Sequence, residues 1–177
     1  MRNVVLYTLM SLDGVAESPD NFVSEFDEEM HANLGEVIGS QDAVLLGRAQ
    51  YDEWAPYWPT SDMQPFADFI NSVPKYVFTS SPLTGAWAES AVLTSLDAVR
   101  ELKAQPGGDI GVHGSITLAR AMLAAGLIDR ISLVVYPVVA GRGRKLFDED
   151  GRTRKLGLIR SQSTSSGGLL LDYEVTR

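Results

Sequence analysis

The sequence predicts an α/β protein with a mixed, mostly parallel sheet flanked by helices and an antiparallel C-terminal hairpin. Runs rich in β-forming residues alternate with segments of helical apolar spacing through the middle of the chain, which is typical of a parallel sheet covered on both faces. The last two apolar runs are separated only by residues 165–168, which favours a hairpin at one edge of the sheet. The length of 177 residues fits a single domain, 1–177.

The first third of the chain opens with a predicted strand. Residues 2–12 alternate loosely between apolar and polar and are rich in β-formers, so we expect a mostly buried strand. Asp-Gly and Ser-Pro pairs then predict a loop at 13–21. Apolar residues at helical spacing predict a helix over 22–39, closed by Gly39. The apolar run 42–47 predicts a short buried strand that ends in glycine.

The remaining elements follow from the same signals. Two prolines and two aromatic residues predict a surface loop at 55–61, and a short helix follows at 61–73. The next expected elements are strands at 75–81 and 90–95 and a helix at 96–108, which a proline and glycines stop. In the last third we expect a strand at 109–114, a helix at 115–126 and a strand at 130–139. A loop at 140–152 then leads to the two hairpin strands, at 155–164 and 168–175.

Composition excludes several classes of function. The chain carries 23 acidic and 15 basic residues, and a net charge of −8 argues against binding of a nucleic-acid backbone but not of a small anionic cofactor. Cysteine is absent, and the two histidines, His31 and His113, lie too far apart in sequence to predict a metal site. No segment approaches the roughly 20 apolar residues of a membrane helix and no signal peptide is evident, so we expect a cytoplasmic protein without membrane association.

Three predicted strand ends carry polar residues. Gly47 and Arg48 follow one strand, Thr79, Ser80 and Ser81 end another, and Gly114 and Ser115 follow a third. In open parallel sheets, ligands bind beyond the carboxyl ends of the strands, so these three ends predict one shared binding site.

Each strand end also has a simpler explanation. The amides after a Ser115 N-cap, from Ile116 to Leu118, would suit a pyrophosphate, or Gly114-Ser115 is only a turn and a cap. Arg48 could hold a phosphate bidentately or pair with a nearby carboxylate, Asp52 or Glu53. The hydroxyls at 79–81 could bond a ribose or a 2′-phosphate, or only cap a loop.

Other candidate residues lie near this predicted edge. Asp13 could orient a polar heterocycle or relay a proton through water, although Asp-Gly is also a plain turn. Tyr51, Trp54 and Tyr136 could line a flat aromatic pocket for a substrate, with core packing as the alternative. His113, at the end of a buried strand, is more often a structural residue than a catalyst.

Four segments in this order and spacing resemble the dihydrofolate-reductase-like superfamily. They are YTLMSLDGVA, AVLLGRAQYDEW, KYVFTSS and IGVHGSITLARAMLAAGLIDRISLVVYPVVAGRGRKLF, and the resemblance spans roughly residues 2–150. It is greatest to stand-alone relatives of the reductase half of the bifunctional riboflavin-biosynthesis deaminase/reductase.

The resemblance implies a cofactor, a fold and a set of site residues. The cofactor would be NADPH as hydride donor, the assembly a homodimer, and the partner a small heterocyclic substrate. Gly47 and Arg48 match the family's Gly-Arg at the cofactor phosphates. Thr79, Ser80 and Ser81 match the strand end near the adenosine ribose. The residues that match the start of the helix receiving the pyrophosphate are Gly114, Ser115, Ile116 and Thr117.

The expected activity is therefore an NAD(P)H-dependent reductase for a pterin-like or riboflavin-precursor-like heterocycle, with Asp13, Tyr51 and Tyr136 as substrate contacts. Asp13 would orient the substrate or feed a proton to it. The alternative is a non-catalytic, nucleotide-binding homodimer that retains the fold. Residues 79–81 supply hydroxyls where folate reductases place an arginine, so the preference between NADP and NAD stays open. Asp27 or Glu28 is the nearest counterpart of the acid that binds the pterin in folate reductases.

Overall fold

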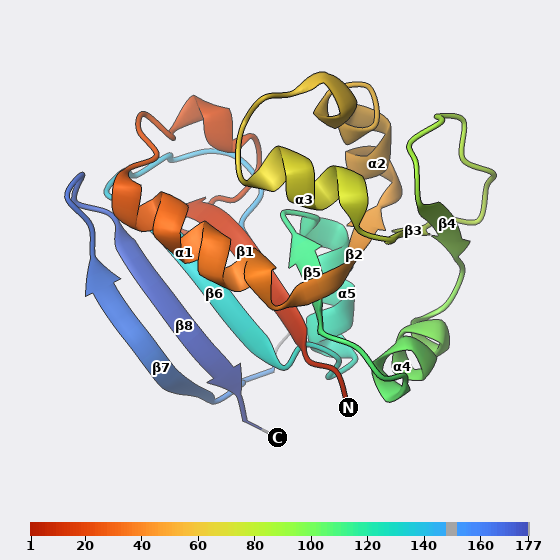
Figure 1. The fold of residues 1–177 in the computed structure, drawn as a ribbon. Helices are drawn as coiled ribbons and strands as arrows, with labels where there is room; N and C mark the ends of the chain where they lie inside the picture. Colours follow the sequence, from red (N-terminus) through yellow and green to blue (C-terminus); the bar gives the residue numbers. More distant parts are fainter. Residues whose placement is uncertain (148–151, 177) are drawn as a thin grey trace.

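Eight strands form one continuous sheet in a computed structural model that describes residues 1–147 and 152–176 (Figure 1). The order across the sheet is β4-β3-β2-β5-β1-β6-β8-β7. The strands are β1 Val4–Ser11, β2 Gln41–Gly47, β3 Lys75–Phe78, β4 Ser90–Leu93, β5 Asp109–His113, β6 Arg130–Tyr136, β7 Leu156–Ser163 and β8 Leu169–Val175. Neighbours from β4 to β6 are parallel, whereas β8 is antiparallel to both β6 and β7. The predicted fold class is confirmed.

Helices cover both faces of this sheet. They are α1 Glu28–Gly39, α2 Arg48–Trp54, α3 Phe66–Ser72, α4 Leu96–Ala104 and α5 Ile116–Ala124, with short 3-10 helices at Pro19–Asn21 and Trp58–Thr60. Buried residues of α1, α2 and α3 belong to one apolar core, and those of α4 and α5 belong to the other. The central strands are buried on both faces, as a sheet packed between two helical layers requires.

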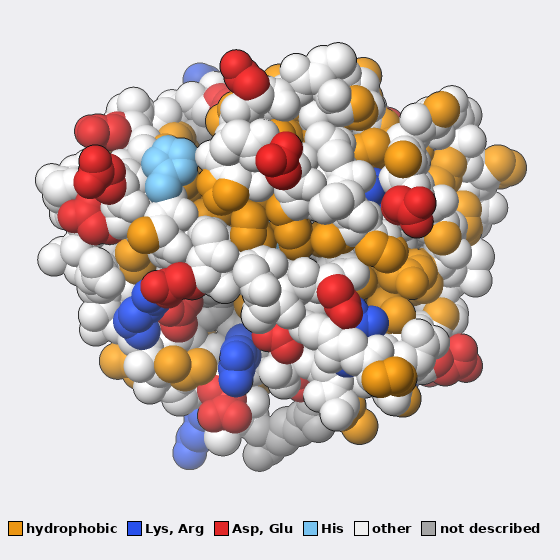
Figure 2. All heavy atoms as spheres, in the orientation of Figure 1, with side chains coloured by type: hydrophobic (Ala, Val, Ile, Leu, Met, Phe, Trp, Pro, Cys, Tyr) orange, Lys and Arg blue, Asp and Glu red, His pale blue; other side chains and the backbone are white. Residues whose placement is uncertain are grey.

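The face that carries α1 and α3 also exposes apolar atoms. Figure 2 shows a band of hydrophobic atoms between these two helices. Val37 of α1 and Phe69 of α3 are both only partly buried against the core beneath. None of the helices among the described residues is long and apolar enough to cross a membrane.

The helix predicted over 22–39 begins later, at Glu28. Asp27 is its N-cap, and its Oδ1 accepts a hydrogen bond from the amide of Met30 at 2.9 Å. A capping side chain satisfies one of the first free amides and so sets where a helix starts. Phe22 still reaches the core from the preceding loop, where its ring packs edge-on against Tyr136 at 6.1 Å.

Two further differences concern residues 48–73. The sequence did not predict α2, because two turns contain too few residues to show a helical period. The helix expected from residue 61 begins at Phe66, and the Ser61 hydroxyl accepts a hydrogen bond from the amide of Met63 in the loop before it. Trp58 in the predicted surface loop is 9% exposed, since its ring packs against Trp54 and Phe66.

Candidate functional site

Two of the three polar strand ends meet directly. β2 and β5 are neighbours in the sheet, so Gly47 and Ser115 emerge side by side at its carboxyl edge. The amide of Gly47 donates a hydrogen bond to Ser115 Oγ at 2.9 Å. A Cβ placed on Gly47 would lie 3.4 Å from the same oxygen, an ordinary van der Waals contact, so the hydrogen bond does not require glycine at this position. The structure therefore brings together the two glycine-led turns that the sequence singled out.

Gln50 links the same two turns and was not found from the sequence. Its Nε2 donates to the carbonyl of His113, and its Oε1 accepts a hydrogen bond from the Ser115 hydroxyl. Because Gln50 lies on α2, which has no clear helical pattern, nothing local indicated that its amide would point toward β5. Its side chain closes a network that joins α2 to the start of α5.

Ser115 stands at the N-cap position of α5, but its side chain does not cap that helix. The prediction of a capping side chain was wrong, because the Ser115 hydroxyl is already engaged by Gly47 and Gln50. Among the described residues, no side chain caps the first amides of this nine-residue helix. Uncapped amides at a helix N-terminus carry a partial positive charge and are suited to an anion.

Arg144 adds a cation beside the first turn of α5. Its Nη1 lies 3.3 Å from Thr117 Oγ1, and its Nε lies 3.1 Å from Glu17 Oε1. The Arg144 side chain is 53% exposed, so the charge faces solvent. The predicted loop at 140–152 lies partly outside the described residues, which stop at Phe147 and resume at Arg152.

Arg48 joins the third strand end, after β3, to the end of β2. Its Nη1 donates to Thr79 Oγ1 at 3.3 Å, and the amide of Ser81 donates to the same oxygen at 3.1 Å. Its Nε lies 2.9 Å from both carboxylate oxygens of Asp52, one turn along α2. The ion pair with Asp52, weighed as the simpler explanation for Arg48, is therefore present in the structure. The carbonyl of Ser81 lies 3.5 Å from Arg48 Nη1, and Ser80 and Ser81 are both exposed.

Both oxygens of the Asp13 carboxylate accept hydrogen bonds from the protein. Its Oδ1 accepts from Ser11 Oγ at 2.6 Å and from the amide of Ala140 at 2.9 Å, and its Oδ2 accepts from the amide of Gly141 at 2.9 Å. The hydrogen bond from Ser11, followed by those from Ala140 and Gly141, lowers the pKa of Asp13 to about 2. A carboxyl with this pKa is ionised near neutral pH, so the geometry favours positioning of the loop over donation of a proton.

The tyrosines predicted to contact a substrate are core residues whose hydroxyls have protein partners. Tyr51 is fully buried and its hydroxyl donates to the carbonyl of Gly85 at 2.9 Å. Tyr136 is 2% exposed, its hydroxyl lies 3.3 Å from Met30 Sδ, and burial raises its pKa to about 12. The simpler interpretation, core packing, describes both tyrosines in this structure.

His113 is a buried structural residue. Its Nε2 lies 2.8 Å from Gln41 Oε1, and its ring packs against Tyr7, Phe66 and Phe69. Burial lowers the pKa of His113 to about 3, so the ring is neutral. Gly111 makes room for this pair, because a Cβ there would collide with Gln41 Oε1 and His113 Nε2.

Asp27, the counterpart suggested for a pterin-binding acid, also has protein partners. Beyond capping α1, its Oδ2 accepts from the hydroxyl of Ser166 at 2.6 Å and from the amide of Ser166 at 3.2 Å. Burial alone would raise the pKa of Asp27, but the hydrogen bonds from Ser166 and the Met30 amide, with the hydroxyl of Thr164, hold it at about 2. Asp27 therefore ties α1 to the β7–β8 turn.

Comparisons with known proteins show the family and the fold. The family model of the RibD C-terminal domain matches residues 2–170. An uncharacterized protein of Bacillus subtilis, YyaP, is 26% identical over 97% of this chain and 94% of its own length. A pyrimidine reductase-like protein from Corynebacterium diphtheriae superposes with a TM-score of 0.72 at 17% identity, over 99% of this chain and 92% of the other. Dihydrofolate reductase from Enterococcus faecalis, solved with NADP(H), superposes with a TM-score of 0.66 at 12% identity, over 99% of this chain and 97% of the other.

Proposed function

The chain belongs to the RibD C-terminal domain family, and from that premise we propose that it is an NAD(P)H-dependent reductase. The substrate would be a flat, conjugated heterocycle of the pterin or riboflavin-precursor type. The fold and family are those of reductases, which supports the reaction class. The observation that carries the proposal is the meeting of Gly47, Gln50 and Ser115 in front of the uncapped amides of α5.

The residues at this edge fit a dinucleotide. Gly114 has a φ of +70°, and a Cβ there would lie 3.2 Å from Gln50 Nε2. The absence of a Cβ would let a ligand approach the backbone of this turn closely. The amides of Ile116 and Thr117 would hold a pyrophosphate, and Thr79, Ser80 and Ser81 would face a ribose. Such a cofactor, when bound, supplies a hydride from its nicotinamide ring.

The protein's own contribution would be mainly orientation. The sheet edge would hold the two reactants in register, and proximity would provide much of the acceleration. Asp13 would act by fixing the loop after β1 against Ala140 and Gly141, since its oxygens already have these partners. A proton would reach the substrate through water, because the described carboxyls Asp13 and Asp27 are both held ionised.

Binding and turnover separate this proposal from its rival. Calorimetric titration of the purified protein with NADPH and with NADH is expected to give saturable binding at micromolar to millimolar concentrations. Loss of the reduced nicotinamide's near-ultraviolet absorbance is then expected with dihydrofolate, a pterin or the riboflavin precursor as acceptor. Failure of both dinucleotides to bind at millimolar concentration would remove the proposal.

The second candidate is a non-catalytic, nucleotide-binding homodimer. Two observations favour this candidate. Both oxygens of Asp13 accept hydrogen bonds from the protein, and His113 is buried and neutral. This candidate predicts dinucleotide binding without oxidation by any of the three acceptors. Turnover of any acceptor at a rate above the spontaneous reaction would eliminate it.

A further inference from the structure

The guanidinium of Arg48 is already largely used by the protein. A guanidinium has five N–H bonds. The Nε hydrogen is shared by the two oxygens of Asp52 at 2.9 Å each. The Nη1 hydrogens face Thr79 Oγ1 at 3.3 Å and the carbonyl of Pro82 at 3.1 Å, and Nη2 lies 3.5 Å from Thr84 Oγ1. Nε and Nη1 are thus engaged, and Nη2 alone keeps donor capacity for a phosphate.

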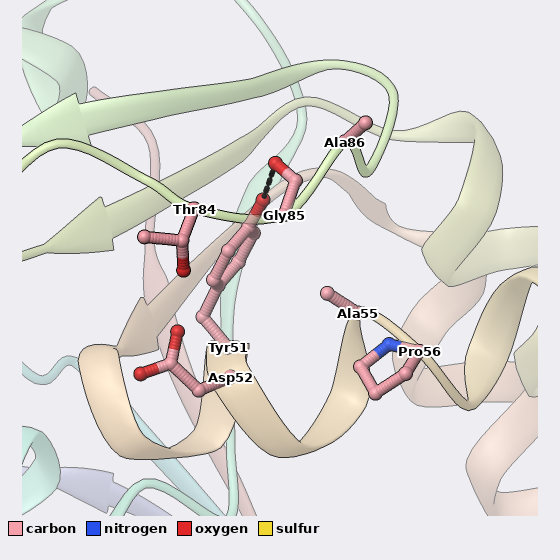
Figure 3. Close-up of a pocket in the computed structure, with 7 residues that line it drawn as sticks. All are labelled: Tyr51, Asp52, Ala55, Pro56, Thr84, Gly85 and Ala86. Atoms are coloured by element: carbon pink, nitrogen blue, oxygen red, sulfur yellow. Dashed lines mark hydrogen bonds between the residues drawn. The ribbon is translucent and has the colours of Figure 1, made fainter.

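Asp52 is placed where it can also meet a ligand. Its side chain is 47% exposed, whereas that of Arg48 is 27% exposed. Asp52 and Thr84 lie on the rim of a hollow of about 370 Å³ between α2 and the segment before β4, and Figure 3 shows their side chains pointing toward one another. The carboxylate accepts from Arg48 Nε alone among the described residues, so it keeps free lone pairs toward solvent.

Among the residues that the structure describes, none adds a second cation to the lining of this hollow or to the contacts of Arg48. The hollow is lined by Tyr51, Asp52, Ala55, Pro56, Thr84, Gly85 and Ala86. The other groups that contact Arg48 are hydroxyls and carbonyls of residues 79–84, none of which is charged. The paired charges of Arg48 and Asp52 therefore cancel at this end of the predicted site.

From this arrangement we infer that the protein selects NADH over NADPH, and that Asp52 is the residue that determines the selection. The inference rests on the proposed function, because it concerns the adenosine ribose of the same dinucleotide. A ribose 2′-phosphate carries nearly two negative charges, so it would meet the Asp52 carboxylate and an arginine whose N–H bonds are mostly occupied. A ribose 2′-hydroxyl instead donates a hydrogen bond, for which a carboxylate is the usual acceptor in NAD sites.

The test compares dissociation constants measured by calorimetry, without any turnover. We expect the wild-type protein to bind NADH about tenfold more tightly than NADPH, as the repulsion of one partly exposed carboxylate predicts. Asp52→Asn keeps the side chain's shape and its acceptor for Arg48 Nε while removing the charge. It is expected to strengthen NADPH binding about tenfold and to change NADH binding by less than about threefold.

Glu53→Gln is the matched control. Glu53 is the next residue on α2, is exposed, and makes no hydrogen bond with Arg48 among the described residues, so its loss removes the same charge without touching the pair. If Asp52→Asn unfolds at a lower temperature than the wild type, Asp52→Ser takes its place and is likewise expected to bind NADPH more tightly than the wild type does.

Three results would overturn the inference, and only one of them affects the function. A wild-type preference for NADPH, or an equal shift in Asp52→Asn and Glu53→Gln, would refute the selection by Asp52 and leave the reductase proposal standing. Absence of binding by both dinucleotides would remove the proposed function together with the inference.

Discussion

Two loops follow the neighbouring strands β1 and β5, and they treat their polar groups in opposite ways. After β1, both oxygens of the Asp13 carboxylate accept hydrogen bonds, from Ser11, Ala140 and Gly141. After β5, the Gly114–Ser115 turn leaves the first amides of α5 without a side-chain partner among the described residues, because the Ser115 hydroxyl turns toward α2. We call the first loop closed, because its carboxylate is hydrogen-bonded to the loop after β6, and the second open, because its first helical amides have no side-chain partner.

The difference shows how to tell a structural polar group from a binding one. A charged group whose hydrogen-bonding capacity is used within the protein holds the structure together, whatever its position relative to the site. Amides left free at a helix start retain their capacity for an anion. By this criterion we propose the loop after β5 as the binding element, with the loop after β1 as its support.

The largest effect that we predict is on the pH dependence of stability, and it comes from replacing His113, the buried residue just before the open turn. His113 is neutral because it is buried, with a pKa of about 3 against 6.5 in an unfolded chain. As the pH falls below 6.5 the unfolded chain gains a proton that the native protein does not, so stability present above pH 6.5 is lost on acidification. Between pH 6.5 and about pH 4, denaturant titration should show the wild type losing roughly 3 kcal/mol more than His113→Asn.

The only other histidine provides the control for this measurement. His31 is exposed on α1, so His31→Asn is expected to keep the acid sensitivity of the wild type. If His113→Asn and the wild type lose equal stability on acidification, the native protein binds a proton at His113 as readily as the unfolded chain does. The turn would then not be supported by a buried, neutral imidazole.

A smaller effect is expected when the open turn itself is altered. Gly114 and Gly126 have φ values of +70° and +66°, at opposite ends of α5. Alanine at either position should cost about 1 kcal/mol of stability, because an L-residue is strained there. Only Gly114→Ala places a Cβ near Gln50 Nε2, so only this variant should weaken dinucleotide binding, by about tenfold.

Thermal unfolding of the two glycine variants measures the loss of stability, and calorimetry measures the loss of dinucleotide affinity. Equal losses of stability with unequal losses of affinity would sharpen the distinction between the open turn and ordinary backbone strain. Equal losses of affinity would mean that the free amides at residues 116–118 are not where the ligand binds.

The smallest effect on binding is expected at the closed loop. Asp13→Asn should change dinucleotide affinity by less than about twofold, since its oxygens face Ser11, Ala140 and Gly141. The pKa of Asp13 is about 2 in the folded protein and 3.8 in an unfolded chain, so its contribution to stability is present above pH 3.8 and lost as the pH falls toward 2. Thermal unfolding of the variant should therefore show a shallower acid slope than the wild type, and an unchanged slope would contradict the closed loop.

Much of the architecture could be predicted from the sequence. The strand positions, the fold class and the placement of Gly47 and Ser115 at one edge follow from apolar runs, glycines and the rule that parallel strands end at one edge. Their direct contact depends on β2 lying next to β5, an order that the sequence did not predict. The predicted start of α1, residue 22, was wrong because Asp27 caps the helix through a contact that periodicity does not encode. α2 was absent from the prediction, and with it Gln50, because seven residues leave no measurable period.

The sequence by itself determined which segments become strands, where glycines let the backbone turn, and which polar residues reach the carboxyl edge, because these depend on neighbours along the chain. The tertiary structure alone decided which of those polar groups stay free. Asp13 finds its partners at Ala140 and Gly141, far along the chain, and Ser115 finds its partner on α2. A polar side chain bonds to whatever donor or acceptor the sheet order places beside it, and that order is a property of the whole fold.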